Sequence, residues 1–507
     1  MKLRYTYFLI LTFSLLFVMI GFNSCKDEGV ISIEIPNKKP DHEPEEEPEE
    51  EENPIDSIYY ITADGSDEND GISQETAWQT SGRLSEVAEF KPGDVILFKR
   101  GEQFGPIALD QAGNGTVENP IIIGAYGDES LPRPIIQATH EVSNAVHIMA
   151  MSGITIQDLK IQGAQHDQLY IDPTNGRCDN IKILNCHVDG INGRHCIRFE
   201  TDIRSGFYFG CDNVEIAYNY IENAGQGFDK TSDGLNCPNI QNNAYIHHNT
   251  FFYNKSEAID LGAGKGHLVE FNIMNGNGER HSGGIKTHVQ SGNQIHDTEN
   301  VMIRNNIILK CIQHAVQIQD GRYIKVYNNT IYHNEQDGKN ALLIATANDN
   351  QYDDDTWLIG NELINNIFYG VTSTITASVV RFGGGREGTP SVYWDDTTRY
   401  KISNNIFYAG PEPNATVVRV QTEDFFVEKP YTEYSNSGSA ISLPFDNFLE
   451  IHGNNYNVDP MFVDPGNEIF ELKEDSPAIN AGIEIGITSD FYDQIITDLP
   501  DIGAIEF

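Results

Sequence analysis

Basic residues are scarce in this chain, which has 33 Lys and Arg against 75 Asp and Glu and a formal net charge of −42 at pH 7. A surface of this sign repels nucleic acids and anionic membranes, so neither is expected as a partner. An acidic polymer stays open as a partner only where a bound cation, Lys and Arg reverse the field locally.

Cysteine is also sparse, and none of the seven cysteines has the CxxC spacing of a zinc site. One of them, Cys25, is interpreted below as a lipidation site. We expect Cys196, Cys237 and Cys311 to fill inward or turn positions as small apolar side chains. We therefore predict no essential disulfide.

No Pro/Gly/Ser-rich linker divides residues 56–507. A segment of about 450 residues is more than one compact core usually fills. A single elongated repeat domain resolves this conflict, and we predict one domain over residues 56–507, with a cap at its N-terminal end and a closing segment at its C-terminal end.

The N-terminus predicts export. Lys2 and Arg4 precede an apolar run over residues 7–22, and no stop-transfer flank follows it. We interpret residues 1–24 as a signal peptide. The Phe-Asn-Ser-Cys sequence that ends at Cys25 resembles the looser lipobox of Gram-negative bacterial lipoproteins, although Phe22 stands where Leu is preferred.

The residues after Cys25 predict a surface tether. Lys26-Asp27-Glu28 resembles the surface-export signal of such lipoproteins. Residues 41–52 carry nine carboxylates and two prolines, so residues 25–55 read as a disordered acidic spacer. The expectation is a monomer that faces the cell surface and contacts the outer membrane only through its N-terminal lipid.

Short apolar segments that end in asparagine recur along the rest of the chain. They are too short for βαβ units and have no amphipathic helix between them, so they predict stacked β coils. Asparagine tolerates tight turns and can both donate and accept hydrogen bonds, so stacked copies predict a ladder. The last asparagines of these segments are Asn219, Asn249, Asn272, Asn306, Asn329, Asn366 and Asn405.

Five further stretches share the order outward, small, apolar, outward. They begin at His195, Asp233, Glu257, Gly283 and His314. If they are equivalent strands, their last residues form one column, and these are Arg198, Asn236, Asp260, Lys286 and Gln317. Parallel strands stack about 4.8 Å apart, so the side chains of Asp260 and Lys286 would project side by side.

Three carboxylates then lie on two adjacent coils, at Asp233, Glu257 and Asp260. They repel one another unless a cation lies between them, and a cluster of oxygens suits Ca²⁺. Ser256 and Asp229 are candidates to complete the ligand set. The alternative is that these carboxylates are only part of a solvated acidic face.

Lys286 is the candidate base. Holding a lysine with a pKa of about 10.4 neutral at pH 7 costs ~4.6 kcal/mol. A neighbouring divalent cation lowers that cost, whereas carboxylates alone raise it. Gly283 and Gly284 are expected to keep the approach to Lys286 open.

These motifs resemble polysaccharide lyases of family 9, within the pectate-lyase-type superfamily. The resemblance lies in Asp233, in Ser256-Glu-Ala-Ile-Asp260 and in Gly283-Gly-Ile-Lys286, with N- and C-terminal motifs such as Lys91-Pro-Gly-Asp and Ser476-Pro-Ala-Ile-Asn similar to the ends of bacterial β-helix proteins. Glu257 and Ser256 stand where the family has Asp. The asparagine segments likewise resemble those of right-handed parallel β-helices.

The resemblance implies a calcium-dependent lyase. Calcium would bind a uronate of a pectic chain, either polygalacturonan or rhamnogalacturonan, and Lys286 would remove its C5 proton, which leads to β-elimination. Substrate-binding candidates are Arg198, Asn236, His288, Gln317 and Trp394. For Arg198, His288 and Trp394 an ordinary structural role stays open.

Two other functions remain open. A β-helix glycoside hydrolase would use two of Asp233, Glu257 and Asp260 as acid and base. A surface lipoprotein that binds glycan without turnover would use the same groove. The polymer and its linkage depend on loops that the repeat pattern does not describe.

Overall fold

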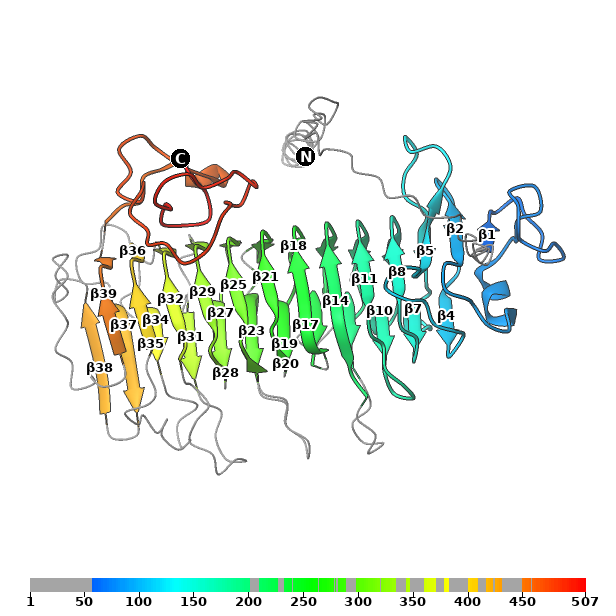
Figure 1. Ribbon diagram of the computed structural model, residues 1–507, viewed down its shortest axis with the longest axis horizontal. Coiled ribbons are helices and arrows are strands. Elements are labelled where there is room, and N and C mark those ends of the chain that lie inside the picture. Colours follow the sequence, from blue (N-terminus) through cyan, green and yellow to red (C-terminus); the bar gives the residue numbers. More distant parts are fainter. Residues whose placement is uncertain are drawn as a thin grey trace, which may run out of the picture. The chain divides into compact units, whose positions relative to one another are not determined.

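A computed structural model describes residues 57–200, 209–226, 232–238, 240–262, 264–277, 279, 281–288, 298–319, 321–333, 343–346, 360–370, 378–382, 400–408, 416–422, 425–430, 449–456 and 458–507. Residues Asp56–Phe507 form one compact unit. Three long sheets build it, and each coil of the chain contributes one strand to each of them in turn (Figure 1). The predicted right-handed parallel β-helix is confirmed.

Sheet 1 contains, in hydrogen-bonded order, β1 (Ile58–Ile61), β2 (Val95–Lys99), β5 (Ile121–Tyr126), β8 (Ile154–Gln157), β11 (Ile181–Leu184), β14 (Cys211–Ala217), β17 (Ile240–His247), β21 (Leu268–Glu270), β25 (Met302–Arg304), β29 (Lys325–Tyr327), β32 (Glu362–Ile364), β35 (Tyr400–Ser403) and β39 (Leu449–His452). Off this path lie β20 (Gly264–Lys265), β24 (Thr298–Glu299) and β28 (Gly321–Arg322).

Sheet 2 carries the candidate site, and it contains β4 (Ile107–Asp110), β7 (Asn144–Met149), β10 (Asp167–Asp172), β13 (Ile197–Phe199), β16 (Leu235–Cys237), β19 (Glu257–Gly262), β23 (Gly283–His288), β27 (His314–Gln319), β31 (Leu343–Thr346), β34 (Ser378–Phe382), β37 (Thr416–Thr422) and β38 (Phe425–Pro430).

Sheet 3 contains β3 (Gln103–Phe104), β6 (Ile135–Gln137), β9 (Lys160–Gln162), β12 (His187–Asp189), β15 (Tyr220–Glu222), β18 (Thr250–Phe252), β22 (Ile273–Asn275), β26 (Ile307–Leu309), β30 (Thr330–His333), β33 (Ile367–Gly370), β36 (Ile406–Tyr408) and β40 (Asn455–Tyr456). The strands β41 (Phe462–Asp464) and β42 (Ile469–Leu472) form a separate hairpin, and the short helices are η1 (Ser81–Glu86) and η4 (Pro465–Asn467).

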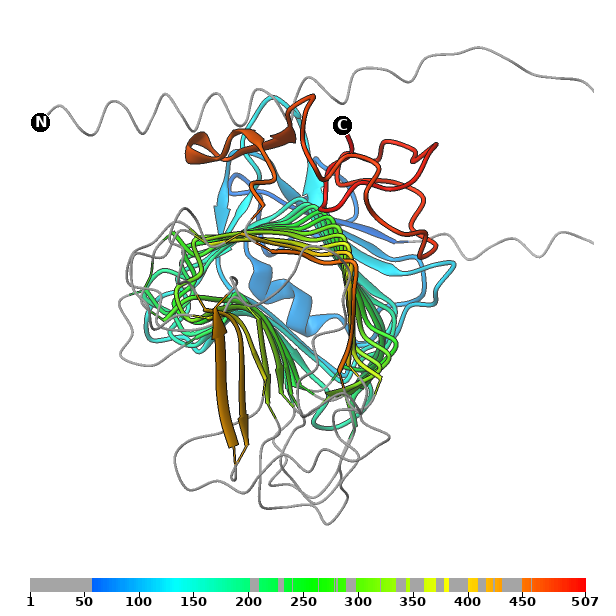
Figure 2. The same cartoon turned by 90° about the vertical axis from the view of Figure 1, so that its left-hand side faces the viewer.

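Alternation along the strands forms the core. Most strands point one or two apolar residues inward, and the equivalent residues of successive coils stack on one another. In sheet 2 these residues are fully buried, and they are Val146, Leu169, Ile197, Leu235, Ile259, Ile285 and Val316. Figure 2 looks along the stack and shows the three sheets enclosing this core, with η1 in the middle of the ring. Leu84 of η1 is part of the same core cluster, so this helix covers the N-terminal opening.

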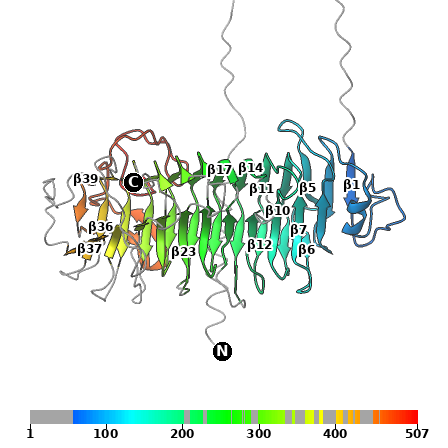
Figure 3. The same ribbon diagram turned by 90° about the horizontal axis from the view of Figure 1, so that it is seen from below.

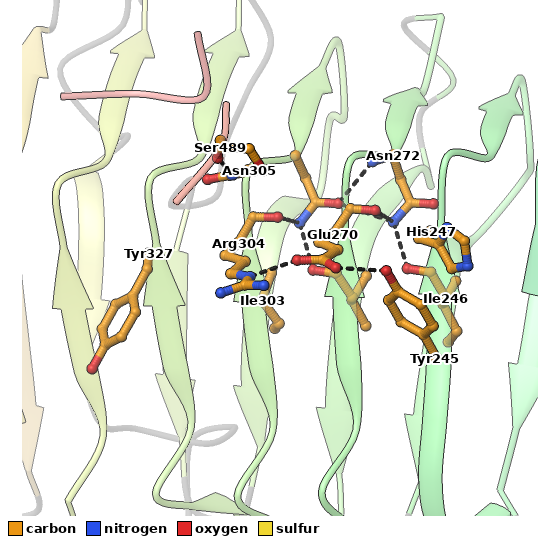
Figure 4. Close-up of polar contacts among 12 residues, drawn as sticks. Tyr245, Ile246, His247, Glu270, Asn272, Ile303, Arg304, Asn305, Tyr327 and Ser489 are labelled. Carbon is orange, nitrogen blue, oxygen red and sulfur yellow. Dashed lines mark hydrogen bonds and ion pairs between the residues drawn. The ribbon is translucent and has the colours of Figure 1, made fainter. Parts of the chain in front are cut away.

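The predicted asparagine ladder runs along the stack. Each member donates through Nδ2 to Oδ1 of the next at 2.9–3.0 Å, and its members are Asn219, Asn249, Asn272, Asn306, Asn329, Asn366, Asn405 and Asn454. Figure 4 shows how each coil is held: Asn272 Nδ2 also donates to the carbonyls of Ile246 and Glu270. The ladder thus ties each coil to its two neighbours.

The sequence analysis assigned both the left-handed turn and the ladder hydrogen bond to the same asparagine, but the structure gives them to two successive residues. The residue in the left-handed region is the one before the ladder asparagine, as at His248 with φ 53° or Asn305 with φ 50°. Where two asparagines follow each other, the first takes the left-handed backbone and the second makes the ladder bond.

The C-terminal segment lies along the flank of the stack. Side chains of left-handed asparagines hold it: Asn305 donates to Ser489 O at 2.7 Å (Figure 4), and Asn365 donates to Ile483 O at 2.9 Å. Phe462 and Phe470 pack there against the outer residues of sheet 3. In Figure 1 this orange and red segment therefore covers several coils.

The six cysteines after Cys25 are all buried, and the structure records no disulfide among them. Cys196 and Cys237 are 0% exposed and Cys311 is 4% exposed, as expected for small apolar core residues. No helix in the described part of the chain is long and apolar enough to cross a membrane. The predicted signal peptide and tether lie outside the described residues.

Candidate functional site on sheet 2

The predicted register of the outward column is confirmed. Arg198 pairs with Asn236, Asn236 with Asp260, Asp260 with Lys286, and Lys286 with Gln317. The strands that carry them follow one another along sheet 2, whose labelled members include β7, β10 and β23 in Figure 3. Asp260 and Lys286 are therefore lateral neighbours, as the spacing indicated.

The three carboxylates are not part of a solvated face. Asp233 is 6% exposed, Glu257 8% and Asp260 9%. A buried carboxylate loses hydration and stays ionised only if hydrogen bonds or opposite charges replace it. The alternative of an ordinary acidic surface is thus wrong at these three positions.

Asp233 is held by its neighbours on two sides. Asn236 Nδ2 donates to its Oδ2 at 2.8 Å, and the backbone N–H of Glu257 donates to its Oδ1 at 3.2 Å. Its own N–H donates to Nδ1 of the buried His195 at 2.9 Å. Burial, followed by the charges of Glu257 and Asp260, raises the pKa of Asp233 well above its usual range.

Glu257 is the carboxylate held ionised. The Ser256 hydroxyl donates to its Oε2, and His314 Nε2 is 3.6 Å from its Oε1. Burial by itself would raise the pKa of Glu257, but the charges of His314 and Lys286, with the hydrogen bonds, lower it to about 2. Two neighbouring acids thus have pKa values shifted in opposite directions.

Asp260 lies between Asn236 and His288. Its Oδ2 is 3.4 Å from Asn236 Nδ2, and its Oδ1 is 3.0 Å from His288 Nε2. Oδ1 is buried and accepts no hydrogen bond of good geometry from the described residues. This oxygen therefore faces the His288 ring and has spare accepting capacity.

Lys286 is protonated in this arrangement. Burial lowers its pKa, but the charges of Asp260, Glu257 and Asp233 outweigh burial and raise it above the usual lysine value. The upward direction of this pKa shift agrees with the sequence analysis, in which carboxylates alone raise the cost of a neutral lysine. A base role requires something cationic that offsets the three acids.

The two glycines each leave room for a neighbouring group. A Cβ at Gly283 would lie 2.7 Å from His314 Nε2, and a Cβ at Gly284 would lie 2.2 Å from Ala315 O. Gly283 therefore makes room for the imidazole of His314, and Gly284 permits close packing of adjacent strands. That the two glycines also keep the approach to Lys286 open stays a prediction.

Arg198 is three strands from Lys286, with Asn236 and Asp260 between them. Its guanidinium already has two acidic partners: Nη1 is 3.7 Å from Asp167 Oδ2, and Nη2 contacts Glu200. The Arg198 side chain is 13% exposed. Its charge is therefore neutralised within its own part of sheet 2.

The remaining predicted residues divide into two groups. Gln317 and Asn236 line the column beside Lys286 and Asp260. Asp229, Trp394 and Cys25 lie outside the described residues. Sequence reasoning assigned no function to the buried histidines His195 and His314, because their position in the repeat was visible but the direction of their rings was not.

Metal geometry differs between two places in the described residues. Ligand atoms of His187, Asp189 and Glu222 on sheet 3 all lie within 4.8 Å of one another, a condition that Asp233, Glu257 and Asp260 do not meet. At sheet 3 the cluster is accounted for without an ion, since His187 Nε2 pairs with Glu222 Oε1 at 2.8 Å and Asn223 donates to Asp189. On sheet 2 the carboxylates are donors that suit a hard cation, and Asp260 Oδ1 accepts no hydrogen bond of good geometry from the described residues.

No family model matches the chain. Two curated proteins match short parts of it: the lacto-N-biosidase of Bifidobacterium longum subsp. longum is 36% identical over 85 residues, and the uncharacterized protein YwoF of Bacillus subtilis is 28% identical over 143 residues. These matches cover 16% and 26% of the chain. They span only 5% and 28% of the two relatives.

Among solved structures, a GH136 lacto-N-biosidase from Eubacterium ramulus superposes with a TM-score of 0.52 and 14% identity, over 80% of this chain and 68% of the other. Pectate lyase Pel9A covers 96% of its own length with a TM-score of 0.44 and 15% identity, too distant to add to the assignment. At these identities the likeness concerns the fold. The chain is a right-handed parallel β-helix protein.

Proposed function

We propose that this protein is a polysaccharide lyase that cleaves a uronic-acid-containing pectic chain by β-elimination, with Lys286 as the base. The observation that carries the proposal is the paired column Asn236, Asp260 and Lys286. It sets one lysine beside buried carboxylates on the same face of sheet 2. A structural role alone gives no reason to bury three acids there, because their desolvation is costly.

The sheet 2 carboxylates suit Ca²⁺ by donor type. Asp233, Glu257 and Asp260 would hold the ion, with Ser256 beside them and Asp229 as a further candidate. The unsatisfied Oδ1 of Asp260 supports this proposal. When bound, the ion would neutralise the uronate carboxylate and acidify the C5 proton.

The chain's own residues would then divide the reaction. Lys286, neutral once the acids beside it are offset, takes the C5 proton through Nζ. The C5 electron pair forms the C4–C5 double bond, and the bond from C4 to the glycosidic oxygen breaks. His288, two residues after Lys286, is the candidate to protonate the leaving oxygen. Asn236 and Gln317 would contact neighbouring sugar units.

A specific observation also favours a second function, a retaining glycoside hydrolase. Asn236 Nδ2 is within 2.8 Å of Asp233 Oδ2 and 3.4 Å of Asp260 Oδ2, so these oxygens are closer together than the roughly 6.5–9.5 Å of inverting pairs. Asp233, with its raised pKa, would be the acid. The E. ramulus structure and the B. longum relative are both lacto-N-biosidases, which makes a hydrolase the natural competitor.

One experiment separates these functions. The purified protein is incubated with polygalacturonan, with rhamnogalacturonan and with neutral oligosaccharides, each with and without a chelator. A lyase gives an unsaturated product that absorbs in the ultraviolet and disappears with the chelator. A hydrolase gives reducing ends without that absorbance. Binding without any new ends would indicate a glycan-binding protein.

The N-terminal features carry a separate proposal for location. Export and a lipid at Cys25 would place the candidate site at the outer surface of a Gram-negative cell, with the monomer tethered by residues 25–55. Mass spectrometry of the N-terminal peptide tests this directly, because a lipid on Cys25 adds a defined mass. An unmodified Cys25 in the mature protein would contradict it.

A further inference from the structure

A glycine in β23 leaves room for a histidine ring from β27. Gly283 pairs with Glu257 on one side and with His314 on the other. A Cβ there would lie 2.7 Å from His314 Nε2 and 3.3 Å from Glu257 Cγ. The backbone does not require glycine, since Gly283 is not in the left-handed region. The missing side chain is therefore what lets His314 reach across a whole strand to Glu257.

A histidine ring also leans over a glycine at the other carboxylate of β19, but here the glycine and the carboxylate belong to the same strand. Gly262 pairs with His288, and a Cβ at Gly262 would lie 2.9 Å from both Cε1 and Nε2 of that ring. Gly262 also lacks a left-handed backbone. The ring of His288 thus leans over Gly262 and brings Nε2 to 3.0 Å from Asp260 Oδ1. His288 therefore reaches its carboxylate from the adjacent strand, whereas His314 crosses the whole of β23 to reach Glu257.

We propose that His314, seated over Gly283, is a positioning residue that orients Glu257. His314 is 4% exposed, so it is too deep to contact a polymer bound on sheet 2. Its Nε2 has no hydrogen-bond partner among the described residues, and the acceptor that it faces is Glu257 Oε1. The Ser256 hydroxyl takes the other oxygen of Glu257, so both oxygens have a defined direction.

The contact of His314 with Glu257 follows from the distances given above. Its consequence for catalysis rests on the proposed function. A carboxylate with both oxygens oriented is ready to bind a cation without rearrangement. Outer-shell partners of this kind typically change metal affinity or activity by about 10- to 100-fold when removed. A sugar-binding histidine would instead change KM for the polymer and leave ion binding intact.

The first test needs no activity. In protein labelled with ¹⁵N-histidine, the Nε2 resonance of His314 is assigned from its loss in His314→Leu. It is expected to shift in Glu257→Gln and in Gly283→Ala, which displaces the ring. Gly105→Ala is the matched control, because its Cβ would meet only Ser81 Oγ at 3.5 Å. A resonance that ignores both Glu257→Gln and Gly283→Ala would overturn the proposal.

The second test measures calcium binding by calorimetry and kcat separately from KM. His314→Leu and Gly283→Ala are expected to weaken calcium binding about 10- to 100-fold and to lower kcat, with KM little changed. His314→Gln retains an N–H donor and is expected to recover most of the loss. Equal losses in the Leu and Gln variants, at unchanged melting temperature, would contradict positioning.

The two proposals fail differently. A protein that shows the His314 signature and binds calcium but leaves every pectic polymer intact refutes the lyase and keeps the positioning residue. A calcium-dependent lyase whose His314→Leu variant has wild-type calcium affinity and kcat refutes the positioning role alone.

Discussion

Removing one member of the asparagine ladder should destabilise the coil that carries Lys286. Asn306 lies in that coil, between β25 and β26. Its Oδ1 accepts from the backbone N–H and from Nδ2 of Asn272, both at 3.0 Å. Its Nδ2 donates to the carbonyls of Val269 at 2.9 Å and Arg304 at 2.8 Å. Alanine at position 306 would leave all of these buried groups without this partner.

The magnitude follows from the backbone N–H of Asn272, which loses its acceptor, whereas Asn272 Nδ2 keeps the carbonyls of Ile246 and Glu270. A buried donor left unsatisfied costs about 1–3 kcal/mol, so Asn306→Ala should lower the free energy of unfolding by about that amount. Equilibrium urea denaturation, followed by circular dichroism, measures it. Asn306→Asp retains the acceptor and loses the donor, which separates the two halves of the bond network. A loss below about 1 kcal/mol in Asn306→Ala would refute the ladder as a major source of stability.

Three further predictions concern charge. Burial, with the charges of Asp501 and Asp490, raises the pKa of Glu506 to about 7. The contribution of Glu506 to stability is therefore fully present below about pH 4.5 and is lost as the pH rises through about 7. The melting temperature of Glu506→Gln should depend less on pH over that window, and a pH dependence identical to that of the wild type would contradict this prediction. Arg198→Ala leaves Asp167 buried without its partner and should cost about 3 kcal/mol in urea denaturation; a raised KM at unchanged stability would instead indicate a substrate role. Calcium at about 100 times its Kd should raise the free energy of unfolding by about 2.7 kcal/mol, and Asp260→Asn should remove that increase. An equal increase in the wild type and in Asp260→Asn would mean that calcium binds elsewhere.

The fold and the register were predictable because both follow from repetition. Parallel strands stack in line, so the same pattern of small and apolar residues in successive coils aligned Asn236, Asp260 and Lys286 correctly. The ladder was equally predictable, because the asparagines equivalent to Asn306 occupy the same position in successive coils. A solenoid repeats one local structure, and the sequence repeats with it.

The contacts that cross between coils were not predictable. Whether His314 reaches Glu257 depends on ring direction and on the space above Gly283, neither of which the repeat pattern encodes. The contacts of Arg198 with Asp167 and Glu200 depend on side-chain rotamers, which the repeat pattern does not encode. The bond from Asn305 to Ser489 joins residues 184 positions apart, in a segment outside the repeat.

The lyase proposal depends most directly on Lys286. The measurement is the initial rate of ultraviolet absorbance increase on the pectic polymer that the wild-type protein cleaves, compared between wild type and Lys286→Ala at saturating calcium. Loss of a positioned base should reduce kcat by about 10²- to 10⁴-fold, while calorimetry shows that calcium still binds. Elimination at the wild-type rate in Lys286→Ala would contradict the assignment of Lys286 as the base.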